Sequence, residues 1–213
     1  MTPPSRSTDH PAVRGGWRRR SAALAGLAAA LALNACGGGT NPLGNPDDIQ
    51  NPPGTGGKKL AFAYFQRCVF PIFLAQLPVG GGSATCAGGG CHDNTTGTGG
   101  ALRVIRDAAT LDVTDPANTA DVVRASDMYK NYYSAQGVTI VGAPLESRLL
   151  NKPLLRNILH GGGLIFDSPD DANAKVFQYW IEHPAPRDQD EFSTATYGMF
   201  NPPDPNTGTC KTE

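Results

Sequence analysis

The stretch from Cys86 to His92 carries the side chains of this chain that are best suited to chemistry. It contains two thiols separated by four residues, and an imidazole directly follows the second thiol. In an oxidising compartment the two thiols can form a disulfide, with His92 following on the surface. A zinc site is a poorer interpretation, because the adjacent ligands Cys91 and His92 strain a tetrahedral geometry and no second close cysteine pair exists.

The same residues resemble the haem attachment site of c-type cytochromes, in which two cysteines are followed by an adjacent histidine. The usual motif has two residues between the cysteines, whereas this chain has four, three of which are glycines that let the extra backbone loop outward. In that family the thiols of Cys86 and Cys91 would each add to a haem vinyl group, and His92 would be the proximal iron ligand. The resemblance implies one covalent haem c per chain.

The resemblance also implies a distal iron ligand. In related domains this ligand stands before the tryptophan of the last helix, and His160 precedes Trp180 by twenty residues. His160 can instead end a helix, with Gly161 as the left-handed cap. Met128 is the alternative distal ligand, although a core helix would also place it among its tyrosine neighbours. Two further candidates stand nearer the C-terminus: His183 and Met199.

Segments with helical periodicity flank this motif. Apolar residues spaced by threes and fours over 60–77 predict a helix, and Pro71 is expected either to break it or to begin a second short helix. The last predicted helix has Ser168 as N-cap and Pro169 at its first position, and it ends at Pro184. Three shorter helices are expected between these two, over 120–133, 145–150 and 154–160.

This order of elements looks like that of small class I cytochromes c. It implies a mainly α, cytochrome c-like helical domain with long irregular loops over residues 59–184, followed by an irregular tail over 185–213. Cys68 and Cys210 are the remaining cysteines of this region, and an oxidising compartment favours a disulfide between them. The alternative is two unpaired thiols, because the sequence does not show proximity.

The N-terminal segment predicts export. Residues 1–35 have the basic, apolar and small-residue zones of a signal peptide, and 33–36 (Leu-Asn-Ala-Cys) resembles the lipobox of bacterial lipoproteins. That resemblance implies cleavage before Cys36 and acylation of its sulfur, and a free buried cysteine is the alternative. Residues 36–58 are expected to be a flexible tether in a disordered N-terminal region. The domain would then face the periplasm from a lipid anchor in a bacterial envelope membrane. Of the two envelope membranes, the outer membrane is the expected one.

Charge and site residues together indicate the class of function. Without residues 1–35 the chain has 13 basic and 18 acidic residues, which excludes nucleic acid as a partner because phosphate binding relies on Lys and Arg. The expected function is electron transfer by a membrane-tethered monohaem cytochrome to a periplasmic or membrane redox protein. A peroxidase-like enzyme is not expected, because no paired catalytic residues are visible. The alternative is a haem-free binding or structural lipoprotein in which Cys86 and Cys91 form a disulfide.

Overall fold

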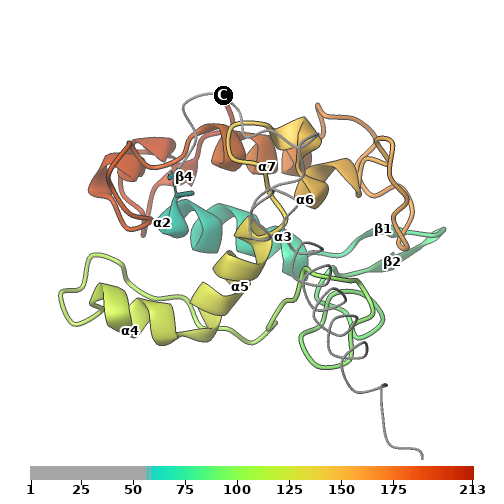
Figure 1. The fold of residues 1–213 in the computed structure, drawn as a ribbon, viewed down its shortest axis with the longest axis horizontal. Helices are drawn as coiled ribbons and strands as arrows, with labels where there is room; N and C mark the ends of the chain where they lie inside the picture. The colour runs from blue at the N-terminus through green and yellow to red at the C-terminus, as the bar shows by residue number, and fades with distance from the viewer. Residues whose placement is uncertain (1–56, 58) are drawn as a thin grey trace, which may run out of the picture. The chain divides into compact units, whose positions relative to one another are not determined.

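The computed structural model describes residue 57 and residues 59–213. The predicted signal peptide (1–35), Cys36 and the rest of the predicted tether apart from residue 57 lie outside the described residues. Helices account for 34% of this region and strands for 8%, so the described part of the chain is mainly helical (Figure 1). Within these residues, no helix has the length and apolar character needed to cross a membrane.

The first helical segment is continuous from α2 (Phe62–Tyr64) through the π-helical turn η1 (Phe65–Val69) into α3 (Phe70–Leu74). Of the two roles predicted for Pro71, the structure shows the beginning of a second short helix, α3, and no break in the helical segment. In a regular α-helix the proline ring would clash with the carbonyl four residues earlier. The wider π turn, in which the Phe70 amide donates to the Phe65 carbonyl, directly precedes Pro71, which lies in the first turn of α3.

A short hairpin connects this segment to the cysteine motif. Strands β1 (Leu77–Val79) and β2 (Gly82–Ala84) pair in antiparallel fashion. Gly80 and Gly81, with φ of 55° and 86°, form the turn, because side chains rarely tolerate this backbone conformation. The chain leaves β2 two residues before Cys86.

The helix predicted over 120–133 is two helices, α4 (Ala120–Ala125) and α5 (Asp127–Gln136). Ser126 separates them with an extended backbone, and its hydroxyl accepts a hydrogen bond from the Tyr129 amide as the N-cap of α5.

The helix predicted over 145–150 is also divided. It consists of a 3-10 turn, η2 (Pro144–Glu146), and α6 (Arg148–Asn151). The buried Ser147 separates these two elements, and its hydroxyl accepts from the Ile140 amide. A serine side chain that bonds to the backbone competes with helix hydrogen bonding, which explains both divisions.

The helix predicted over 154–160 does not form, because Leu155 and Asn157 adopt left-handed backbone angles with φ of 51° and 57°. The last helix, α7 (Ala172–Glu182), begins three residues later than predicted. Its N-cap is Asp171, whose carboxylate accepts from the amides of residues 173 and 174.

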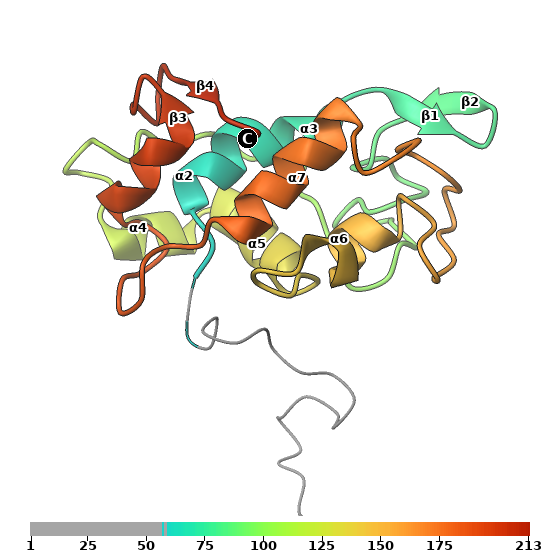
Figure 2. The ribbon, with the colours of Figure 1, turned by 90° about the horizontal axis from the view of Figure 1, so that it is seen from above.

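Helix α7 crosses the first helical segment, as Figure 2 shows from above. Trp180 is fully buried there, and its indole nitrogen donates to the Ala61 carbonyl at 2.9 Å. The Trp180 ring centre lies 5.4 Å from that of Phe65 and 6.2 Å from that of Tyr132 on α5. Aromatic packing therefore holds α5, α7 and the first segment around one core.

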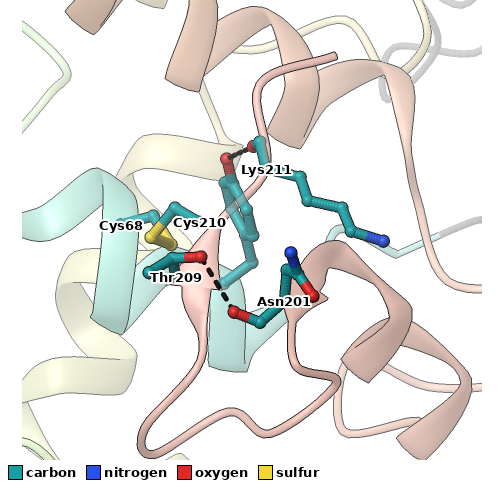
Figure 3. Close-up of a disulfide and its surroundings, with 6 residues drawn as sticks. Cys68, Asn201, Thr209, Cys210 and Lys211 are labelled. Atoms are coloured by element: carbon teal, nitrogen blue, oxygen red, sulfur yellow. Dashed lines mark hydrogen bonds between the residues drawn. A yellow bond between two sulfur atoms is a disulfide. The ribbon is translucent and has the colours of Figure 1, made fainter.

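Residues 185–213, expected to be an irregular tail, contain only short regular elements and fold onto this core. They form a 3-10 helix, η3 (Thr194–Met199), and a two-stranded sheet of β3 (Phe200–Asn201) and β4 (Thr209–Cys210). Phe200 is buried against the ring of Tyr64, whose hydroxyl donates to the Lys211 carbonyl. A disulfide joins Cys68 of η1 to Cys210 of β4 (Figure 3).

A buried carboxylate holds the same C-terminal region against α4 and α5. The side chain of Glu191 is only 4% exposed, and it accepts from the Tyr129 hydroxyl at 2.7 Å and from Arg124 Nε at 3.0 Å. Burial disfavours the charged form, but the hydrogen bonds from its own amide, Tyr129 and Arg124 prevail and hold the pKa of Glu191 below its usual range.

Replacing Glu191 with glutamine is expected to lower the free energy of unfolding by about 1–3 kcal/mol, because the amide cannot serve as anionic partner to Arg124. A depressed carboxylate pKa stabilises the fold above the pKa of an unfolded glutamate, and this contribution is lost as pH falls below about 4.5. Urea denaturation at pH 7 and at pH 4 measures both effects. Asp190→Asn, at a carboxylate 3.6 Å from Arg124 and 51% exposed, is the matched control and should change stability little.

Candidate functional site

The widened cysteine motif folds back on itself. The His92 amide donates to the Cys86 carbonyl at 2.9 Å, and the Cys91 amide donates to the Gly88 carbonyl at 2.9 Å. The additional residues therefore form a turn that keeps Cys86 beside His92 despite their separation in sequence. Both cysteines are half-buried and carry free thiols, with no bond between them.

The ring of His92 is oriented by its backbone surroundings. Its Nδ1 lies 3.1 Å from the Leu102 carbonyl, which can only accept, so Nδ1 carries the proton and Nε2 is unprotonated. Burial lowers the pKa of His92 and favours this neutral form. A neutral imidazole with one nitrogen bonded to a carbonyl is the usual arrangement of a histidine that binds a metal.

His160 has the same arrangement on the facing side. Its Nδ1 lies 2.9 Å from the Gly163 carbonyl, which can only accept, so Nε2 is the nitrogen that could bind a metal. The ring centres of His92 and His160 are 6.3 Å apart and their planes are inclined by 15°. A metal–nitrogen bond of about 2.0 Å, with the ring centre roughly 1.2 Å further back, puts two imidazoles on opposite sides of one metal about 6.4 Å apart. The observed spacing therefore suits two axial ligands of one metal.

Both histidines line an apolar pocket. Its cavity volume is about 100 Å³, and that of an adjoining pocket is about 470 Å³, within the range of small-molecule and cofactor sites. Cys86 also lines the first pocket, and Cys91 lines the adjoining one, which both histidines share. The apolar side chains of the wall come from α3, α6, α7 and the connecting loops: Phe73, Leu102, Val138, Leu149, Ile165, Phe166 and Phe177.

The residues of this pocket fit a covalently attached haem. Among the described residues, no group of three or more His, Cys, Asp or Glu side chains is placed to hold a metal ion. A haem brings its own four nitrogen ligands and needs only axial ligands from the protein. Arg148 and Lys152 line the pocket and offer positive charge to the two propionates of a haem. Burial, and then the neighbouring Cys91, raise the pKa of Cys86 to about 11, so its sulfur keeps its proton at neutral pH.

The structure does not bring the other predicted ligands to this site. Met128 on α5 is fully buried in the core and does not line the pocket. His183 follows α7, with its Nδ1 2.8 Å from the Tyr179 carbonyl and its ring stacked on that of Tyr179. Met199 is buried in the C-terminal region. His160 is therefore the distal candidate that the geometry favours.

Sequence reasoning missed the residues that support the two imidazoles. Gly99 touches the His92 ring, since a Cβ built there would lie 2.4 Å from Nδ1. The glycine-rich run after His92 was the available signal for such a close approach. The sequence could not show that the carbonyls of Leu102 and Gly163 orient the rings, because every residue has a backbone carbonyl.

Comparison of the chain with family models, with curated proteins and with solved structures gives no match. The interpretation of the site consequently depends on its own residues and their geometry.

Proposed function

We propose that the chain is a membrane-tethered monohaem c-type cytochrome, with a cytochrome c-like domain, that transfers electrons in the bacterial cell envelope. One observation carries the proposal: His92 and His160 lie 6.3 Å apart with nearly parallel rings beside a pocket whose wall contains Cys86. Two metal-binding imidazoles and nearby free thiols at an apolar pocket are the protein groups that a covalent haem requires.

Each residue of the site has a distinct role in this proposal. The Cys86 and Cys91 thiols would hold the haem covalently through its vinyl groups. His92 and His160 would hold its iron through their Nε2 atoms, and the carbonyls that lie against their Nδ1 atoms orient both rings. The haem supplies one-electron chemistry, while the apolar wall excludes water. Two histidine ligands favour a lower potential than a His/Met pair.

The proposed location follows from the N-terminal sequence. Export and cleavage before Cys36 would leave an acylated cysteine at the membrane and a tether over 36–58. The domain would then face the periplasm, with the outer membrane as the first choice. Its partner would be a periplasmic or membrane redox protein that receives or supplies one electron.

Covalent haem is the expected result when the full-length chain is produced together with a c-type maturation system. After denaturation, haem should remain with the polypeptide and its spectrum should be that of a thioether-linked haem. The Cys86→Ser/Cys91→Ser double variant should lose this haem, because serine cannot form the thioether bonds. His183→Ala, outside the pocket, is the control and should keep it.

Haem-free protein from a competent host would contradict the proposal. If mass spectrometry then found a bond between Cys86 and Cys91, the haem-free envelope lipoprotein would be the better interpretation.

A further inference from the structure

The loop that carries His160, residues 155–164, has backbone hydrogen bonds to the rest of the domain only near its base. Every residue in it is exposed or half-buried, whereas the flanking Leu154 and Ile165 are buried. The Ile165 amide closes the base by donating to the Pro153 carbonyl at 2.8 Å. The loop can therefore move about this base without uncovering the main core.

Within this loop the hydrogen bonds of His160 are local. The Gly163 amide donates to the His160 carbonyl at 2.9 Å, and His160 Nδ1 donates to the Gly163 carbonyl. In the described part of the chain, no backbone hydrogen bond joins residues 157–164 to any residue outside this segment. The imidazole and its support would consequently move together.

The backbone at the start of the loop is unfavourable. Leu155 has φ of 51°, in the left-handed region that leucine rarely adopts. Leu159, one residue before His160, has 90% of its surface exposed. The closed loop thus keeps an unfavourable backbone angle at Leu155, and relief of this angle lowers the cost of opening. Leu159, in solvent, does not hold the loop closed.

His92 is held in a contrasting way. Its amide donates to the Cys86 carbonyl, its own carbonyl accepts from the Val104 amide at 2.8 Å, and its ring lies against Gly99. These contacts tie His92 to three separate parts of the motif region. His92 is therefore fixed by its surroundings, whereas His160 is not.

We propose that the His160 loop opens and that the site then binds a small neutral ligand, with carbon monoxide as the probe, in the position that His160 leaves. The inference depends on the proposed haem site. In the exchange, the bond between His160 Nε2 and the iron breaks and a bond from the ligand carbon to the iron forms. No electron is transferred, and the imidazole leaves as an unbound side chain. The apolar wall around the site favours a neutral ligand over an anion.

The test uses the full-length, haem-loaded, reduced protein mixed with carbon monoxide and followed by its visible spectrum. The binding rate should reach a limit as carbon monoxide concentration rises, because loop opening must come first. In His160→Ala the position is already vacant, so the rate should rise linearly with concentration. Haem-loaded wild type that binds no carbon monoxide would overturn the inference while leaving the proposed function intact.

A hinge variant tests the role of the loop. Leu155→Gly removes the penalty at φ of 51°, stabilises the closed loop and should weaken carbon monoxide binding about tenfold. Leu159→Gly, in the same loop but without a left-handed backbone, is the matched control and should weaken binding less than about twofold. Equal affinities of the two variants would overturn the inference. A chain without covalent haem would contradict the proposed function itself.

Discussion

Substituting Gly99 with alanine is expected to remove most of the correctly ligated haem protein, because the new methyl group would overlap the ring of His92. A Cβ at Gly99 would lie 2.4 Å from Nδ1, 2.6 Å from Cε1 and 2.7 Å from the Cys91 carbonyl oxygen. The surroundings cannot easily yield, since the Gly99 amide is bonded to that same carbonyl at 2.7 Å and the ring is bonded to the Leu102 carbonyl. Overlap of this kind costs about 1–3 kcal/mol, or roughly five- to 150-fold in the population of the native ring position.

Gly90→Ala is the matched control, because Gly90 lies inside the cysteine motif and a Cβ there meets nothing within 4 Å. Haem content per chain and the visible spectrum should be normal in Gly90→Ala and altered in Gly99→Ala. Circular dichroism should show that both variants remain folded. Equal haem content and identical spectra in the two variants would mean that the glycine does not position His92.

The sequence predicted helices best where caps and apolar periodicity agreed. The start of α4 at residue 120 and the end of α7 before Pro184 agree with the predicted helices. The helix predicted over 154–160 failed because a local backbone feature, the left-handed Leu155, overrode the periodicity. This feature and the π turn before Pro71 have no residue signature, because tertiary packing selects them.

The side chains of the candidate site were predictable from the sequence, but the backbone groups that orient them were not. The motif from Cys86 to His92 and the position of His160 could be recognised from residue types and spacing. The backbone carbonyls that orient both rings could not, because they depend on how distant loops meet. The burial of Met128 also became evident only from the packing of α5 against the aromatic core.

Removing the Cys68–Cys210 disulfide is expected to cause the largest loss of stability in this protein. The bond closes a loop with a sequence separation of 142 residues, which in the chain-entropy account corresponds to about 5 kcal/mol of unfolded-state entropy. Losing it in the Cys68→Ala/Cys210→Ala variant should lower the free energy of unfolding by about 3–5 kcal/mol. Urea denaturation of the full-length chain measures the difference.

The single variants Cys68→Ala and Cys210→Ala distinguish the covalent bond from local packing. Each breaks the same bond, so each should lose nearly as much as the double variant, and the two losses should not add. Cys68 is 6% exposed in η1, so its truncation alone adds a small packing loss to the shared effect. If the stability losses of the two single variants instead summed to that of the double variant, local packing around Cys68 and Cys210 would explain the stability. The disulfide itself would then contribute little.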